Sequence, residues 1–145
     1  MTTPIASPPL TDDVRLQEYL EPLLQTAARR QLWLFFLDAD DRLGGPVMPT
    51  AELPRDPSRM VLTEDLGEQT VADVIGARFS TLMQELGLAQ VVLVWERRGG
   101  AKMHAEEREW ARALGAALRA EGARVRAQFL LHDRGLRILA PDDAV

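Results

Sequence analysis

The chain has 145 residues and no cysteine, and its 17 basic and 22 acidic residues give a net charge of −5. This length is typical of one domain with a substantial hydrophobic core. The lack of cysteine excludes disulfide scaffolds, thiolate zinc sites and cysteine nucleophiles, and the mild acidity disfavours nucleic-acid binding through bulk positive charge. The longest apolar run, residues 32–37, is much shorter than the roughly 20 residues of a membrane-spanning helix. We therefore expect a cytoplasmic protein that does not contact membranes.

The sequence pattern divides the chain into a short arm, one domain and a short tail. Residues 1–10 contain three prolines and predict a flexible N-terminal arm. The domain is expected over residues 11–140, and residues 141–145 are expected to be a frayed tail. A helix follows the arm at once, and Pro22 either kinks it or begins a second helix.

Strands are predicted after this helix. The nearly continuous apolar run at 31–38 predicts a buried strand. Residues 42–48 are expected to return beside it as a hairpin. This second strand should be bulged or at an edge, because two glycines and a proline interrupt it. A proline-rich loop is expected over 49–57, and a short third strand over 59–62.

The second half of the chain alternates helices and strands. Helical spacing of apolar residues predicts helices over 69–86 and 104–121, each closed by a glycine. Strands are predicted over 89–95, 125–131 and 136–139. The order α-β-β-(β)-α-β-α-β-β indicates an α/β (α+β) domain, with a single mixed β-sheet flanked by helices.

Three aspartates follow the first apolar strand: Asp38, Asp40 and Asp41. Carboxylates at the end of a strand can hold Mg²⁺, which would suit a small metal-dependent hydrolase or phosphoryl-transfer enzyme. The same residues are typical of a hairpin turn, because an aspartate side chain bonds to its own backbone. The hairpin expected at this point favours the turn.

A basic loop with two glycines joins the clearest strand to the helix that follows. It contains Arg97, Arg98, Gly99, Gly100 and Lys102. Glycines allow a ligand to approach the backbone, and guanidinium groups bind carboxylates and phosphates. The spacing does not match a P-loop, and a solvated flexible loop is the alternative interpretation. We expect these five residues to contact the binding partner, an unknown protein or a small anionic ligand.

The two histidines do not have the spacing of a metal site. His104 stands where a helix begins, and His132 where a turn is expected. Neither belongs to a motif that would place two histidines on one face of a helix or strand. We therefore expect no metal ion and no other cofactor.

The segment from residue 31 to residue 139 resembles a reduced JAB/MPN domain of the RadC-like branch. The resemblance lies in the order of the elements and in the stretch VVLVWERRGGAKMHAEEREWARAL. In that family the equivalent stretch carries the metal-binding motif H-x-H-P-S-G, followed by an aspartate on the next helix. If Gly100 corresponds to the glycine of the motif, Trp95 and Arg97 take the two histidine positions.

The other functional positions of the family are also changed. The aspartate position falls on Arg108, or on Glu107 if the loop is one residue shorter, and Glu52 is the acid nearest to the family's catalytic glutamate. Tryptophan does not ligate zinc, and a guanidinium repels it. The resemblance therefore implies a JAB/MPN (cytidine-deaminase-like) architecture without the metal and the peptidase chemistry. Such a catalytically inactive, metal-independent pseudoenzyme would act as a binding or protein-interaction module.

A further hypothesis concerns association with a second copy. The strand expected over 42–48 is the plausible edge of the sheet, and an open edge can pair with another chain. The sequence therefore allows a homodimer built through this strand edge or through a helix face.

Overall fold

The computed structural model describes residues 7–51 and 53–140, which form a mixed α/β domain. The elements in chain order are α1 (Asp13–Leu24), β1 (Gln31–Leu37), β2 (Leu43–Ala51), β3 (Met60–Thr63), β4 (Gly67–Thr70), α2 (Val71–Leu86), β5 (Gln90–Glu96), α3 (Ala105–Ala120), β6 (Arg124–His132) and β7 (Gly135–Ile138). This order matches the predicted one except for an additional strand, β4. No helix within the described ranges is long and apolar enough to cross a membrane.

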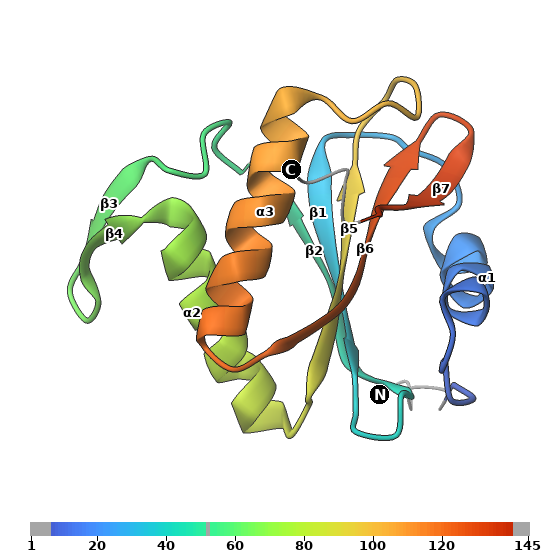
Figure 1. Ribbon diagram of the computed structural model, residues 1–145, viewed down its shortest axis with the longest axis horizontal. Helices are drawn as coiled ribbons and strands as arrows, with labels where there is room; N and C mark the ends of the chain where they lie inside the picture. Colours follow the sequence, from blue (N-terminus) through green and yellow to red (C-terminus); the bar gives the residue numbers. More distant parts are fainter. Residues whose placement is uncertain (1–6, 52, 141–145) are drawn as a thin grey trace.

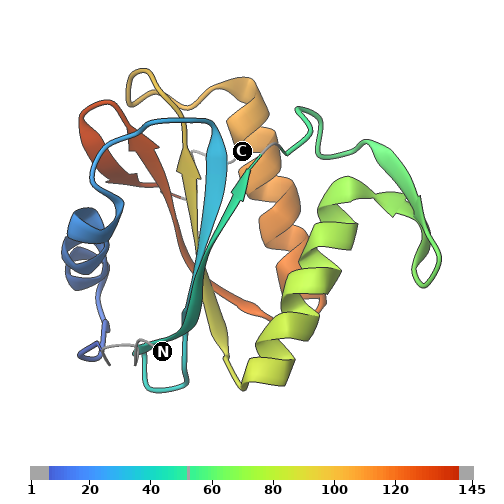
Figure 2. The same ribbon diagram turned by 180° about the vertical axis from the view of Figure 1, so that it is seen from behind.

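Five strands form the central mixed sheet, in the spatial order β2-β1-β5-β6-β7. β5 and β6 run parallel because α3 carries the chain back between them, and the other neighbouring pairs are antiparallel. α2 and α3 cover one face of the sheet, and α1 lies on the other (Figures 1 and 2). The structure therefore confirms the mixed sheet flanked by helices.

Each face of the sheet has its own apolar cluster. The buried residues of the cluster under α2 and α3 are Leu32, Leu34, Phe36, Ala72, Met83, Val91, Leu93, Trp95, Met103, Trp110, Ala111, Leu114, Leu118 and Leu130. Those of the cluster under α1 are Leu10, Leu16, Leu20, Leu24, Ala27, Phe35, Leu37, Val92, Val94, Phe129, Leu131 and Leu136. β1 and β5 contribute alternate residues to the two clusters. Burial on both sides explains why these two strands have nearly continuous apolar sequences.

The sequence of α2 defines both of its ends and its contact with α3. Thr70 is the N-cap residue, and its hydroxyl oxygen accepts a hydrogen bond from the backbone N–H of Asp73 at 3.1 Å. Gly87 ends the helix with a φ of 68°, a left-handed conformation that glycine adopts without strain. A Cβ atom on Gly76 would lie only 2.7 Å from the Cβ of Ala117. The glycine therefore allows α2 and α3 to pack in direct contact.

One detail resolves an alternative that the sequence left open, and two differ from the sequence expectations. Pro22 lies inside α1, so the chain forms a single helix there. β2 continues through Pro49 to Ala51, into the segment expected to be a loop; proline is tolerated because β2 is an edge strand. β4 pairs with β3 in a second, two-stranded sheet. Its sequence, GEQT, lacks the alternating apolar residues from which a strand is predicted.

The described end of the N-terminal arm packs beside the turn between β1 and β2. Ser7 and Leu10 are buried. The Ser7 hydroxyl oxygen accepts a hydrogen bond from the backbone N–H of Leu43 at 2.7 Å, and the Leu10 N–H donates to a carbonyl of the turn at 2.8 Å. Residues 1–6 and the tail at 141–145 lie outside the described residues.

Candidate functional site

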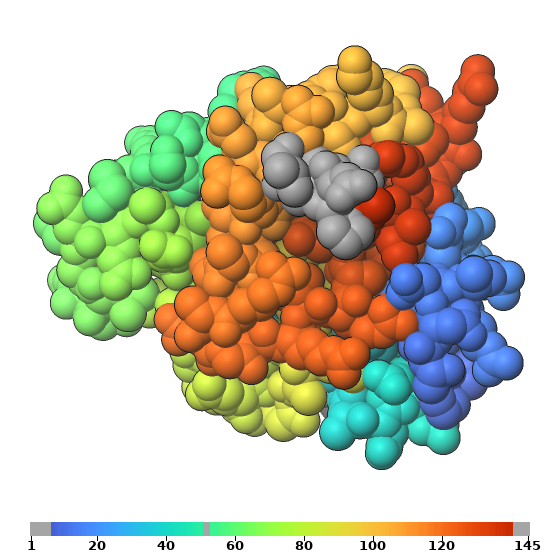
Figure 3. All heavy atoms as spheres, in the orientation of Figure 1, coloured from blue at the N-terminus to red at the C-terminus, as the bar shows by residue number. Residues whose placement is uncertain are grey.

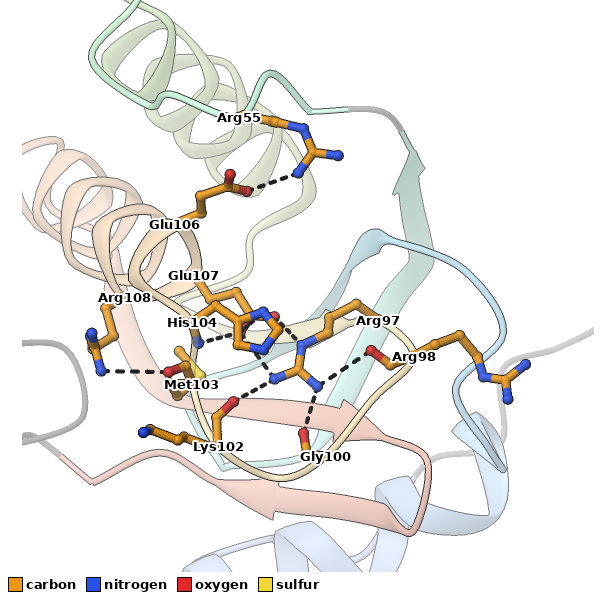
Figure 4. Close-up of polar contacts among 10 residues, drawn as sticks. All are labelled: Arg55, Arg97, Arg98, Gly100, Lys102, Met103, His104, Glu106, Glu107 and Arg108. Carbon is orange, nitrogen blue, oxygen red and sulfur yellow. Dashed lines mark hydrogen bonds and ion pairs between the residues drawn. The ribbon is translucent and has the colours of Figure 1, made fainter.

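The basic loop lies where β5 ends and α3 begins, and Arg97 is at its centre (Figure 4). Only 10% of the Arg97 side chain is exposed. Its Nε and Nη2 atoms donate hydrogen bonds to the two carboxylate oxygens of Glu107, at 2.6 and 3.1 Å. Nη1 also donates to the Gly100 carbonyl at 2.5 Å, and Nη2 to the Lys102 carbonyl at 2.6 Å. All three guanidinium nitrogens are therefore engaged within the protein.

Glu107, in the first turn of α3, is held as closely as Arg97. Its side chain is 14% exposed. Its Oε1 atom also accepts a hydrogen bond from the backbone N–H of His104, the N-cap residue of α3, at 2.7 Å. The positive end of the helix favours a carboxylate here. A buried ion pair is stable only when its remaining hydrogen-bonding groups are satisfied, and the backbone of the loop satisfies them.

The remaining residues of the loop fall into two groups. Gly99 has a φ of 115°, which glycine alone adopts readily, and a Cβ atom there would lie 3.2 Å from Nη1 of Arg97. Arg98 is exposed and pairs at 3.0 Å with a carboxylate of the turn between β6 and β7. The Lys102 side chain is also exposed. Arg98 and Lys102 therefore present cations to solvent, whereas Arg97 is buried, Gly99 lies against it, and the exposed Gly100 directs its carbonyl to the guanidinium.

A small pocket opens between this loop, α3 and the start of β1. It holds about 40 Å³, which is space for a few water molecules or one small polar group. Trp95 and Trp110 form its apolar wall, with ring centres 6.1 Å apart. A wider hollow beside it shares Arg30 and Arg97 with the pocket and also includes Arg55. We call the pocket and the hollow together the cleft.

Hydrogen bonds fix the tryptophan wall of the cleft. The indole N–H of Trp95 donates to the side-chain oxygen of Gln128 at 2.7 Å, and the Gln128 amide donates to the Ala111 carbonyl at 3.0 Å. The indole N–H of Trp110 donates to the Pro54 carbonyl at 2.7 Å. Buried indoles whose N–H groups have partners keep one orientation, so the wall is rigid.

The rim of the cleft is polar and more open. Arg30 donates hydrogen bonds to the carbonyls of Leu53 and Pro54, at 2.6 and 3.4 Å. Arg55 pairs with Glu106 at 3.1 Å, and both side chains are exposed. Exposed ion pairs of this kind contribute about 0–1 kcal/mol. Arg55 can therefore exchange Glu106 for another carboxylate at little cost.

Glu96, between Trp95 and Arg97, points to the opposite face of the sheet. It is 4% exposed, and its carboxylate accepts four hydrogen bonds. The donors are the backbone N–H groups of Ala28 and Arg29 and the side chains of Gln31 and Trp33, at 2.6, 3.1, 2.8 and 2.7 Å. Burial raises the pKa of this carboxyl, but the hydrogen bonds outweigh burial and the pKa lies below its usual value. Glu96 is therefore an ionised anchor between β5 and the start of β1.

The two histidines occupy different environments. His104 is exposed at the start of α3, and His132 is buried at the end of β6. Burial lowers the pKa of His132, and the nearby cations Arg97 and Arg137 lower it further. Its Nδ1 atom accepts a hydrogen bond from the backbone N–H of Arg134 at 3.3 Å. His132 is therefore a neutral structural residue behind the loop.

The aspartates after β1 form the predicted turn. Oδ1 of Asp38 accepts hydrogen bonds from the backbone N–H groups of Asp40 and Arg42, at 2.8 and 3.1 Å. Asp41 has a φ of 62° and accepts a hydrogen bond from the Gln90 side chain at 2.8 Å. Within the described residues, no group of three histidine, aspartate or glutamate side chains is arranged to hold a metal ion.

Sequence reasoning missed three residues of the cleft. Arg30 comes directly before β1, and the antiparallel pairing of β1 with β5 brings the start of β1 beside Glu96. If this pairing had been assumed from the sequence, Arg30 would have been placed next to the loop. Trp110 lies on the helix predicted over 104–121, and its indole packs in the core while it lines the cleft. Arg55 lies in a loop whose position no sequence pattern specifies. Glu52 lies outside the described residues.

The function of the chain has to be inferred from the cleft and the loop themselves. No family model, curated protein or solved structure matches the chain.

Proposed function

We propose that the chain is a metal-free binding module, built on a scaffold similar to a RadC-like JAB/MPN domain, that recognises an anionic group at the rim of the cleft. The observation that carries this proposal is the buried pair of Arg97 and Glu107. In the resemblance, Arg97 takes the position of a metal-binding histidine, and Glu107 is one of the two candidates for the aspartate position. A guanidinium held by a carboxylate and two carbonyls supplies the positive charge at this point.

This arrangement supports binding rather than hydrolysis. Metal-assisted hydrolysis needs several good ligands and an open coordination position. Both oxygens of Glu107 accept hydrogen bonds from Arg97, and one also accepts from the His104 backbone. Neither a free base nor a free ligand remains in the pair, and its role is to hold the loop in one shape.

The exposed cations around the loop define what the module binds. Arg55, Arg98 and Lys102 are exposed around the cleft and its loop, on a protein whose net charge is −5. Arg55 lines the hollow of the cleft, whereas Arg98 and Lys102 stand on the loop outside its lining, and the adjoining pocket admits one small polar group against the tryptophan wall. A carboxylate fits both features, because arginine binds it in a bidentate manner. Such a carboxylate belongs either to an acidic segment of a partner protein or to a small polycarboxylate.

The two sources of the carboxylate are tested with two probes, a fluorescein-labelled hexaglutamate peptide and citrate. The variant Arg98→Glu/Lys102→Glu reverses both exposed charges of the loop, and Arg15→Glu/Arg124→Glu reverses two exposed charges elsewhere. We expect the loop variant to bind the preferred probe about tenfold more weakly or worse, equivalent to about 1.4 kcal/mol, and the control variant to bind normally. Equal binding by the two variants, or no binding of either probe to the natural chain, contradicts the proposal.

A separate experiment tests whether the protein holds a metal ion. Thermal unfolding is measured at increasing concentrations of zinc. A specific site filled at about 100 times its Kd would raise the free energy of unfolding by about 2.7 kcal/mol. We expect no such increase. Retention of one zinc ion per chain through purification, measured by elemental analysis, would contradict this part of the proposal.

A further inference from the structure

The hairpin of β3 and β4 exposes apolar side chains on one face. It forms a two-stranded sheet of its own and extends away from the main sheet near the start of α2 (Figures 1 and 3). Met60 is 53% exposed and Leu62 is 83% exposed. The two residues are separated by one position on β3 and therefore lie on the same face. This is the one strand on which two large exposed apolar side chains stand together in the described part of the chain.

Contacts at both ends hold the hairpin in position. Arg78 of α2 binds both carboxylate oxygens of Asp65, at 2.5 and 2.9 Å. At the other end, the backbone N–H of Val71 donates to the Arg59 carbonyl at 2.8 Å. A partner that binds β3 therefore meets a preformed strand, which reduces the entropy lost on association.

The edge of β3 lacks the protection that the main sheet has. Edge strands commonly carry prolines or charges that prevent pairing with another chain. β2, at one edge of the main sheet, contains Pro46 and Pro49, whereas β3 reads Met-Val-Leu-Thr. Within the described residues, β3 pairs with β4 alone. Its other edge is therefore the better site for strand addition, rather than the edge over 42–48.

We propose that two copies of this chain associate through β3, in antiparallel orientation about a two-fold axis. Pairing centred on Val61 places Met60 of each copy opposite Leu62 of the other. Side chains directly opposite in antiparallel strands point to the same face and pack against each other. The four apolar side chains then cover one another, and the two hairpins become one four-stranded sheet.

Charge at the two ends of β3 supports a second copy as the partner. Arg59 precedes the strand and Glu64 follows it, and both side chains are exposed. Neither forms an ion pair within the described residues. Pairing centred on Val61 places Arg59 of one copy opposite Thr63 of the other, one residue from Glu64, so that opposite charges lie near each other at both ends of the paired strands, twice by symmetry. The apolar face of the strand is therefore complementary to itself, and its two ends carry opposite charges.

The association is expected to be weak and dependent on concentration. An interface of two short strands is well below the roughly 1,600 Å² of a standard stable complex. Sedimentation velocity across about 10 μM to 1 mM, a range in which weak complexes dissociate, should show a reversible shift from monomer to dimer. A monomer at every concentration overturns the proposal.

Substitutions identify the surface that associates. Leu62→Asp places a charge in the centre of the interface and should abolish the dimer. Leu23→Asp, at another exposed leucine on α1, should leave it unchanged. Circular dichroism establishes that both variants are folded. A dimer that survives Leu62→Asp, or that Leu23→Asp also removes, contradicts association through β3.

A charge exchange tests the antiparallel orientation. Arg59→Glu alone and Glu64→Arg alone place like charges together and should each weaken association several-fold. The double variant Arg59→Glu/Glu64→Arg restores opposite charges at both ends, and should associate as the natural chain does. If the double variant is weaker than either single variant, the antiparallel pairing is wrong.

Discussion

Arg97 and Glu107 show how a buried ion pair can define a loop. Each residue alone would be an unpaired charge shielded from most water, whereas together they satisfy each other and the loop's carbonyls. Gly99 is needed because its backbone has a positive φ and approaches the guanidinium closely. The residues expected to contact a ligand are thus partly the residues that shape the surface on which a ligand binds.

Removing both partners of this pair should cost less stability than the two single removals added together. Arg97→Met leaves the Glu107 carboxylate without its charge partner, and we expect a loss of about 3–5 kcal/mol in the free energy of unfolding. The double variant Arg97→Met/Glu107→Leu should lose less than the sum of the two single variants. Urea unfolding of the four proteins measures this coupling. Additive losses would mean that the two side chains act independently.

Glu96 should make stability depend on pH. Because its pKa is lowered in the folded state from the ordinary 4.5, its contribution is present above that pH and is lost as the pH falls through the folded-state value. We expect Glu96→Gln to cost about 2–3 kcal/mol at pH 7, and the difference from the natural chain to shrink towards pH 3. Urea unfolding at several pH values tests this, with the exposed Glu109→Gln as the control. A difference that is constant with pH contradicts an ionised Glu96.

The sequence predicted the position of some residues of the site but not the role of others. It placed Arg97, Gly99 and Lys102 in one loop after a buried strand, because the strand's apolar run is unmistakable. It did not reveal that Arg97 turns inward, since burial of an arginine depends on a carboxylate and carbonyls that only the folded chain brings together. Nor did it indicate that Glu96, next to Arg97, anchors the other face.

At the level of elements, the contact between α2 and α3 depends on one glycine. Gly76→Ala adds a Cβ atom 2.7 Å from that of Ala117. Overpacking of this kind costs about 1–3 kcal/mol, and the better helix propensity of alanine, about 1 kcal/mol, offsets only part of it. We therefore expect a lower thermal midpoint. Gly115→Ala, whose nearest neighbours are ends of longer side chains, should be less harmful; the reverse order contradicts this explanation.

Elements with strong apolar patterns were predictable, and those held by polar contacts were not. α2, α3 and β5 follow from periodicity and from the glycines that close the helices. β4 was missed because its residues bury little and its position depends on pairing with β3 and on the Asp65–Arg78 contact. The sequence did not decide between one helix across Pro22 and two helices. The proline lies close to the C-terminal end of α1, where both a continuous helix and a new helix starting at the proline are compatible with the local sequence.

At the scale of the whole molecule, the two apolar clusters share β1 and β5 and should unfold together. Trp33 packs with the cluster under α1, whereas Trp95 and Trp110 belong to the cluster under α2 and α3. In the variant Trp33→Phe, fluorescence reports only the second cluster. We expect its urea transition to coincide with the far-ultraviolet circular dichroism of the same variant, as two-state unfolding requires. Separate midpoints would show that the faces unfold independently.

The position of β1 between β2 and β5 has a consequence for how the chain is synthesised. β2 emerges from the ribosome soon after β1, but β5 follows only after the segment that contains β3, β4 and α2. At about 5–20 residues per second, the second edge of β1 remains open for several seconds, with the aromatic side chains of Phe35 and Phe36 exposed. Nascent or truncated chains that stop before residue 90 should therefore be the form of this protein most in need of a chaperone.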